Sequence, residues 1–298
     1  KNKYLNFSLS VSNLNIKEII HFGLFVLAGG TSIIIVARLD MMMIASLLDL
    51  EQVAFYAVAF YIGNAIKIPA RAITSISTPL IANAWERKDL KLIQKLYYKT
   101  SINQLIIGGV FFLCIWLSID DVFSLLPLKF QGGKWVVFFI GLAQLFNITT
   151  GINGVIIINS SYYRYDFVTN IILLLFTFIT NYIFIPSDWH MFGVSISGIN
   201  GAALATALSV FLFNTIRLLL IKIKMDIHPF DTKTIYVLIC LILIFLSITF
   251  IPFTDIPILN IGIRSLVVVT LFLPMLFIFN LSEDIIGLIH DVKKRYIS

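Results

Sequence analysis

Lys67 and Arg71 lie one helical turn apart in "NAIKIPARAIT" (64–74), within an apolar stretch long enough to cross a membrane. A basic side chain at the centre of a membrane helix costs about 2.5 to 3.5 kcal/mol on insertion-based scales. Lys67 is near the middle of its stretch, so its ammonium group cannot easily reach either membrane surface. Residues four apart share a helix face, so the two like charges repel each other. The pair therefore needs a wet cavity, a neighbouring carboxylate or an anionic ligand.

The preceding apolar stretch holds two further charges, Arg38 and Asp40, in "VARLDMMMIAS". Residues two apart on a helix do not face each other, so these two need not neutralise one another. One interpretation is structural, with Asp40 paired to Lys67 or Arg71 to pin two helices together. The other is an anion-binding cavity, favoured because Asp40 is the one acid set against three cations. Arg264 ranks lower, because it can snorkel towards the outer surface.

Amide side chains form a third group of candidates. Asn147 and Asn153 lie in "GLAQLFNITTGINGVIIINSS", and Asn64 precedes the basic pair. Polar groups in membrane helices commonly bond neighbouring helices together, which is the favoured interpretation. If the cavity holds a sugar, the same amides suit its hydroxyl groups. The candidate substrate-binding set is Arg38, Asp40, Lys67, Arg71, Asn64, Asn147 and Asn153.

The composition is that of a membrane protein. Of 298 residues, 59% are hydrophobic and only 13% charged, against about 25% charged in soluble domains. The net charge of +6 is spread over many short connectors, which argues against a nucleic-acid partner. Cys114 and Cys240 have no nearby His or Cys, so neither a disulfide, a metal site nor a cofactor is expected.

The hydropathy pattern predicts an all-α integral membrane protein. About 20 apolar residues are needed to span the hydrocarbon core. Eight such spans are predicted, at 19–47, 53–82, 101–118, 135–159, 166–185, 200–221, 234–251 and 258–280.

The connectors alternate between a basic set and an acidic or short set. Most of the 22 Lys and Arg residues, Arg217 counted among them, fall on one side, whereas the other side holds only Lys129 and Lys134. The positive-inside rule then places both ends of this chain in the cytoplasm. The connector 86–99 has apolar residues at helical spacing and is predicted to lie on the inner leaflet as a separate amphipathic helix in contact with membrane lipids.

The phrase "GVSISGINGAALATALSV" (193–210) has small residues at the start of a span, which allow close helix approach. Its wording resembles the polysaccharide flippases that move lipid-linked O-antigen-type oligosaccharides. These belong to the superfamily of multidrug, oligosaccharidyl-lipid and polysaccharide exporters. Two further stretches, "RLDMMMIASLLDLEQVAFYAVAF" and "PLIANAWERKDLKLIQKLYYK", resemble the same family.

The resemblance implies a MATE-like exporter fold of which this chain is the second lobe. Residues 1–225 would form its six-helix bundle, and 226–298 two additional helices with a basic tail. The amino-terminal lobe would then be a missing partner, and the chain a piece of a longer protein. The implied substrate is an oligosaccharide on an undecaprenyl pyrophosphate carrier, flipped across the bacterial inner membrane. Arg38, Asp40, Lys67 and Arg71 would line the cationic cavity.

Three other functions were weighed against transport of this substrate. A multidrug exporter of the same superfamily is expected to have an acidic or apolar cavity for cationic drugs. A membrane-embedded glycosyltransferase or polymerase is expected to have a large hydrophilic loop or an acidic cluster, and the sequence shows no nucleophile with a paired base and no metal-ligand spacing. A structural scaffold would have no cavity. A transporter without enzymatic activity is therefore expected.

Overall fold

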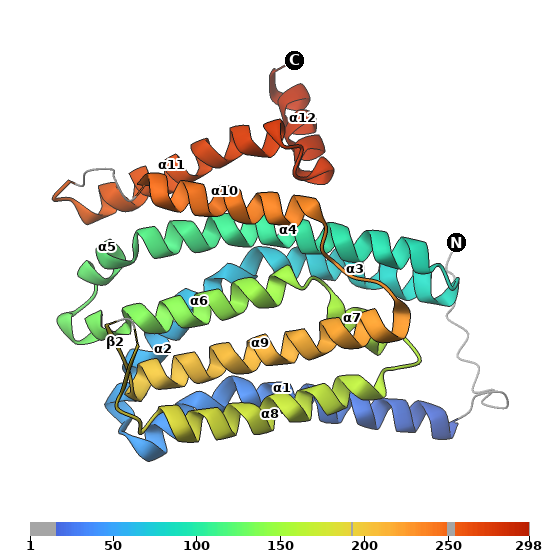
Figure 1. The fold of residues 1–298 in the computed structure, drawn as a ribbon, viewed down its shortest axis with the longest axis horizontal. Helices are drawn as coiled ribbons and strands as arrows, with labels where there is room; N and C mark the ends of the chain where they lie inside the picture. Colours follow the sequence, from blue (N-terminus) through green and yellow to red (C-terminus); the bar gives the residue numbers. More distant parts are fainter. Residues whose placement is uncertain (1–15, 192, 249–253, 298) are drawn as a thin grey trace, which may run out of the picture.

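The structure is a computed structural model, and it describes residues 16–191, 193–248 and 254–297. These residues are almost entirely helical, as predicted, and the long helices run side by side along one direction (Figure 1). The elements are α1 (Ile16–Leu47), α2 (Leu50–Asn64), η1 (Ala65–Lys67), α3 (Ile68–Glu86), α4 (Leu90–Leu117), α5 (Ile119–Ser124), η2 (Leu128–Gly133), α6 (Lys134–Thr149), α7 (Asn153–Ile158), α8 (Arg164–Phe184), β1 (Trp189–Met191), β2 (Val194–Ile196), α9 (Gly198–Met225), α10 (Thr232–Ile248), α11 (Pro257–Ile278) and α12 (Glu283–Ile297).

Five helical stretches in the described chain are long and apolar enough to cross a membrane: 50–86, 90–117, 164–184, 198–225 and 257–278. The stretches 23–36 and 38–47 of α1 are bent by 42° and make a sixth if they count as one span. α6 and α10 are shorter, with 16 and 17 residues, but both run along the bundle (Figure 1). An integral membrane protein is thus supported, while the eight-span count stays a prediction.

The span predicted at 135–159 is wrong in its length. α6 ends at Thr149, and Gly151 adopts a positive φ of 65°, which interrupts the helix before the short α7. Ser101 on α4 donates a 2.5 Å hydrogen bond to the carbonyl of Thr149. That bond satisfies one of the backbone groups left open where the helix stops.

The separate amphipathic helix predicted at 86–99 does not form. Asp89 caps α4 by accepting a 2.9 Å bond from the Leu92 backbone amide, and the helix then continues through Leu117. Ile93 and Tyr97, part of the expected lipid-facing stripe, are fully buried. Helical periodicity was the correct inference, but the apolar face packs on the protein itself.

One connector departs from the all-α prediction. β1 and β2 form a two-stranded antiparallel hairpin in which Trp189 pairs with Ile196. The hairpin leads into α9, whose first turns lie against the end of α8. A Cβ added to Gly201 would lie 2.7 Å from the carbonyl carbon of Phe184, so only glycine fits at this contact.

The bundle is assembled around α4 and α6. α4 packs against α3, α6, α10 and α11, and α6 packs against α2, α4 and α9. α1 and α8 cover the outer side of α9 (Figure 1). α10 and α11 pack on α4 through an aliphatic cluster that includes Leu105, Ile244 and Val268.

The two sets of connectors lie at opposite ends of the bundle. The turns α3–α4, α7–α8 and α9–α10 lie at one end with α12, whereas the turn α1–α2, α5 with η2, the hairpin and the start of α11 lie at the other (Figure 1). The first group is the basic set, so we expect a reporter fused after Ile297 to be cytoplasmic and one inserted near Asp188 to be periplasmic. Paired phosphatase and fluorescent-protein fusions measure this, and reversed signals at both positions would contradict the orientation.

We expect Gly201→Ala to destabilise the protein by about 1 to 3 kcal/mol, because the new methyl group meets the rigid backbone at the end of α8. Gly262→Ala is the matched control, since a Cβ there meets nothing within 4 Å and alanine favours the helix. Thermal unfolding of the detergent-solubilised protein, followed by size-exclusion chromatography, measures both. Equal stability of the two variants would show that the α8–α9 contact is not tight.

Candidate functional site

Lys67 lies where the helix through 50–86 changes its hydrogen-bond pattern. Pro69 has no backbone N–H, so it cannot donate to the carbonyl of Ala65. The Ile68 amide donates to that carbonyl instead, which gives the single 3-10 turn η1. α3 then begins at Ile68, with Pro69 in its first turn. Pro69 therefore sets a local break beside Lys67, not a kink within a regular helix.

Lys67 and Arg71 line a cavity of about 450 Å³ between α3, α4 and α6. Lys67 is half-buried and Arg71 is exposed. The remaining lining is neutral: Ala70, Thr74, Ser75, Gln104, Asn147, Ile148 and Gly151. The cavity thus combines two cations with hydroxyl and amide groups, and no acid lines it.

The less favoured interpretation, in which Asp40 pairs with Lys67 or Arg71, is wrong, and so is the place of Asp40 among the substrate-binding candidates of the cavity. Asp40 is buried and accepts hydrogen bonds from Tyr56 Oη at 2.7 Å, Thr206 Oγ1 at 2.6 Å and Asn181 Nδ2 at 2.7 Å. These donors come from α2, α9 and α8, so the carboxylate joins four helices through neutral partners. Asp40 therefore belongs to the packing of the bundle and not to the cavity.

A second buried acid, Asp166, forms an ion pair with Arg217, a cation that the sequence analysis assigned to a connector. Arg217 is buried in α9, where its Nη2 contacts Asp166 Oδ1 and lies 3.1 Å from Asn170 Oδ1. Its guanidinium carbon is also 4.1 Å from the ring centroid of Phe213. Arg217 is thus an internal partner of α8, and counting it among the cytoplasmic cations was wrong.

Arg264 does not snorkel to the surface as predicted. It is 8% exposed, and its Nη1 lies 2.8 Å from Asp121 Oδ2 and donates to the carbonyl of Leu117. Asn260 donates to the other oxygen of Asp121 at 2.9 Å. These contacts tie α11 to α5 at the hairpin end of the bundle.

In the described part of the chain, neither Lys67 nor Arg71 forms an ion pair with a carboxylate. Asp40, Asp166 and Asp121, which could have met them from other helices, are all held elsewhere. The positive charge of the cavity therefore has no internal counter-charge among these residues. The arrangement is therefore not a structural ion pair, and it leaves the two cations accessible to a ligand from outside the chain.

The amides divide between the two roles considered for them. Asn214 on α9 donates to Asn147 Oδ1 at 3.0 Å, and its own Oδ1 accepts from Asn153 and Thr150 at 3.0 Å each. Asn153 therefore bonds neighbouring helices together, which is the interpretation that the sequence favoured. Asn147 has both roles, because it is held by Asn214 and also lines the cavity.

Two other candidates lie outside the cavity. Asn64 bonds back to the Phe60 carbonyl at 2.9 Å within α2, and it does not line the cavity. Arg38 is exposed next to the bend between 23–36 and 38–47, and it is also not part of the lining. Of the seven predicted residues, the cavity brings together Lys67, Arg71 and Asn147.

The sequence analysis missed Thr74, Ser75 and Gln104. Gln104 is buried on α4, and its Nε2 donates to Thr74 Oγ1 at 3.3 Å. Thr74 lies seven residues after Lys67, which places both on the same helix face. That spacing could have predicted Thr74 as a lining residue. Gln104 carried no such signal, because only the packing of α4 on α3 brings it to the cavity.

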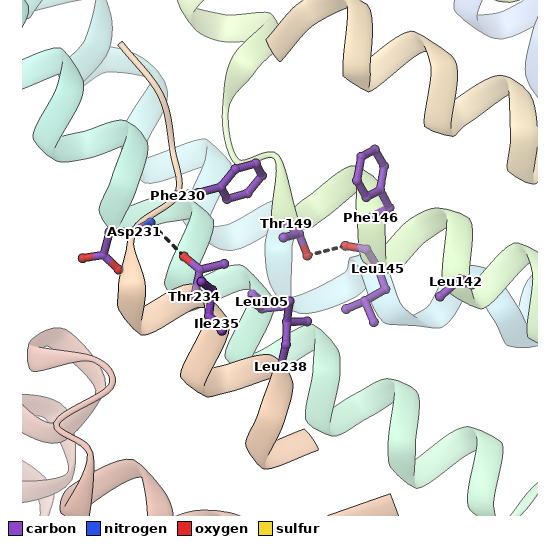
Figure 2. A pocket seen from close by; sticks show the side chains of 10 residues that line it. All are labelled: Leu105, Leu142, Leu145, Phe146, Thr149, Phe230, Asp231, Thr234, Ile235 and Leu238. Carbon is purple, nitrogen blue, oxygen red and sulfur yellow. Dashed lines mark hydrogen bonds between the residues drawn. The ribbon is translucent and has the colours of Figure 1, made fainter. Parts of the chain in front are cut away.

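A separate, apolar pocket of about 580 Å³ lies between α4, α6 and α10 (Figure 2). Leu105, Leu142, Leu145, Phe146, Ile235 and Leu238 give it a hydrocarbon lining. Thr149, Thr234 and Asp231 add polar groups, and the Asp231 amide donates to Thr234 Oγ1 at 3.2 Å. None of the seven predicted residues lines this pocket.

Comparisons with protein-family models, with curated proteins and with solved structures find no match to this chain. Among the described residues, no group of three His, Cys, Asp or Glu side chains is placed to hold a metal ion.

Neutralising the cavity cations should not destabilise the protein. We expect Lys67→Gln and Arg71→Gln to leave the unfolding temperature unchanged or raised, because each removes an insertion cost without stranding an acid. Arg217→Gln should instead cost about 3 to 5 kcal/mol, since it leaves Asp166 buried without its cation. Thermal unfolding in detergent compares the three variants. A loss for Lys67→Gln as large as that for Arg217→Gln would show that Lys67 has a structural partner.

Proposed function

We propose that this chain is part of a transporter that flips an oligosaccharide linked to a polyprenyl pyrophosphate across the bacterial inner membrane. The observation that carries the proposal is the cavity that holds Lys67 and Arg71 without an acid. The proposed cargo is a repeat unit of a surface polysaccharide such as O-antigen. The lipid carrier stays in the bilayer while its charged, hydrophilic head passes through the cavity.

The chemistry of the cavity matches that head group. A hydrogen bond to a charged partner contributes about 1.5 to 3 kcal/mol, and the arginine guanidinium can hold two phosphate oxygens at once. Lys67 acts as a point charge with rotatable donors. Thr74, Ser75, Gln104 and Asn147 supply the neutral donors and acceptors that sugar hydroxyls require.

The same lining disfavours the nearest rival. An exporter of cationic drugs gains affinity from acidic or apolar walls, because a buried cation needs a counter-charge or an aromatic face. The lining contains neither an acid nor an aromatic ring. A scaffold without a cavity is likewise disfavoured by the 450 Å³ space beside the two cations.

The resemblance to polysaccharide flippases also gives the proposal its wider setting. In that setting an amino-terminal lobe completes the substrate path, and the exposure of Arg71 is compatible with such a partner. The chain expressed alone is then expected not to restore polysaccharide export in a strain that lacks its flippase. The chain joined to its amino-terminal lobe is expected to restore it.

Binding to undecaprenyl pyrophosphate in nanodiscs tests the charge argument directly. We expect Lys67→Gln or Arg71→Gln to weaken binding about ten- to a hundredfold, and Arg71→Lys to weaken it less because the charge survives. Lys91→Gln, an exposed cation outside the cavity, is the matched control. Arg38→Gln should behave like this control, since Arg38 does not line the cavity.

Lys67→Gln and Arg71→Gln should also lower export in the complete protein, while the amount of each variant in the membrane stays equal to that of the unsubstituted protein. Unchanged binding by both cavity variants, or an equal loss in Lys91→Gln, would contradict an anion site at Lys67 and Arg71. Undecaprenol, which has no phosphate, serves as the ligand control. Equal affinity for undecaprenol would show that only the lipid tail is recognised.

A further inference from the structure

α12 (Glu283–Ile297) differs from the other long helices in its direction. It lies at the end of the bundle that carries the basic connectors, and it runs across the other helices rather than along them (Figure 1). If the bundle helices cross a membrane, α12 lies in the plane of its surface. Helices in that position either bind the bilayer interface or dock on another protein.

Specific contacts hold the start of α12 against α4. Asp284 accepts bonds from Lys99 Nζ at 2.5 Å and Asn103 Nδ2 at 3.0 Å. Ser282 donates to Asn103 Oδ1 at 2.5 Å and also caps the helix through the Ile285 amide. Partial burial acts in the opposite direction, but the bonds from Lys99 and Asn103 hold the pKa of Asp284 below its usual range. The helix is therefore anchored at its first turn in a fixed orientation.

The apolar stripe of α12 is wider than the bundle covers. Ile285, Ile286 and Ile289 pack against the cluster between α4, α10 and α11. Leu288 lies three residues after Ile285 and so borders the same stripe, yet 64% of its surface is exposed. An apolar edge is thus left uncovered on a helix that is otherwise polar on its outer side.

Exposed aromatic and aliphatic residues also occur near the start of α10 and at the end of α11, which precedes α12. Tyr236 and Phe279 form a ring pair with centroids 6.0 Å apart, and they are 43% and 48% exposed. Ile278, the last residue of α11, is 74% exposed. Aromatic side chains of this kind mark the level at which hydrocarbon meets head groups. α12 contacts this end of α11 through His290, whose ring centroid lies 6.0 Å from that of Phe277.

The charge of α12 indicates what covers the edge. Its acids, Glu283, Asp284 and Asp291, precede a run of three basic residues, "KKR" at 293–295. Anionic lipids of the cytoplasmic leaflet attract basic segments next to the membrane. An acidic protein partner would also meet these charges, but a lipid surface accounts in addition for the exposed apolar residues Ile278, Phe279 and Leu288 at this end of the bundle.

We propose that α12 is an interfacial helix that binds the surface of anionic phospholipids, with Leu288 inserted among the acyl chains and the basic segment 293–295 at the phosphate groups. This surface is separate from the cavity of Lys67 and Arg71, and the proposal does not rest on the transported substrate. It also replaces the expectation that 86–99 is the lipid-surface helix, because Ile93 and Tyr97 of that stretch are buried in the bundle and the stretch continues into α4.

Spin labels at single cysteines test the position of α12 in the full chain, with Cys114 and Cys240 changed to alanine. A label at Leu288→Cys should collide with dissolved oxygen, which concentrates in lipid, more than with a water-soluble nickel chelate. A label at Asp291→Cys, exposed on the polar side, should show the reverse. Ile278→Cys is the lipid-facing control.

The electrostatic part is tested in vesicles of phosphatidylcholine with and without phosphatidylglycerol. Lys293→Gln, Lys294→Gln and Arg295→Gln together should move the Leu288 label towards water only when phosphatidylglycerol is present. Each charge removed should change the equilibrium between the lipid-inserted and the water-exposed positions of the Leu288 label about fivefold. High salt on the unsubstituted basic segment should give the same shift, which keeps the test valid if the triple variant folds poorly.

Three results would overturn the proposal. Strong collision of the Leu288 label with the nickel chelate in both vesicle types would place it in water. Weak collision with both reagents would show that protein covers it, whether a second copy or another partner. A shift that is independent of phosphatidylglycerol would remove the role assigned to anionic lipid.

Discussion

The bundle depends on one constraint, which is that a carboxylate in a low-dielectric interior must be held by partners from its own protein. Asp40 meets this requirement with three neutral donors, and Asp166 meets it with Arg217. Once these acids are satisfied, they cannot neutralise cations elsewhere. The positive charge of Lys67 and Arg71 thereby stays without a counter-charge among the described residues, and the candidate site is a consequence of how the acids are paired.

The same acids also determine which helices lie together. Asp40 joins α1 to α2, α8 and α9, while Asp166 joins α8 to α9. Also on α9, Asn214 holds the end of α6 through Asn147, Thr150 and Asn153. α6 is therefore fixed in rotation where it forms one wall of the cavity. The break after Thr149 fits this position, since polar backbone at membrane depth is tolerated where protein groups or a cavity satisfy it.

Short-range interactions explain where the helices begin and turn better than they explain where each helix ends. Asp49 and Asp89 cap α2 and α4, and Pro69 produces the 3-10 turn at Lys67, all from short-range chemistry. Gly151, in contrast, interrupts an apolar run that reads as one long span. Its backbone approaches the Tyr97 carbonyl and the Ser101 amide of α4, where a Cβ would lie within 3.3 Å of both. That close approach could not be anticipated from hydropathy, because it depends on a neighbouring helix.

The amino-acid sequence by itself determined the membrane class, the approximate positions of the helices, the alternation of basic and acidic connectors, and the presence of cations inside an apolar segment. These properties follow from composition and from periodicity within one helix. Tertiary structure alone decided that Asp40 bonds to Asn181 and Thr206, 141 and 166 positions away, rather than to Lys67. It likewise decided that Arg217 is internal and that Gln104 reaches the cavity. The physical reason is that a side chain's partners depend on the rotation and packing of whole helices, which no local pattern encodes.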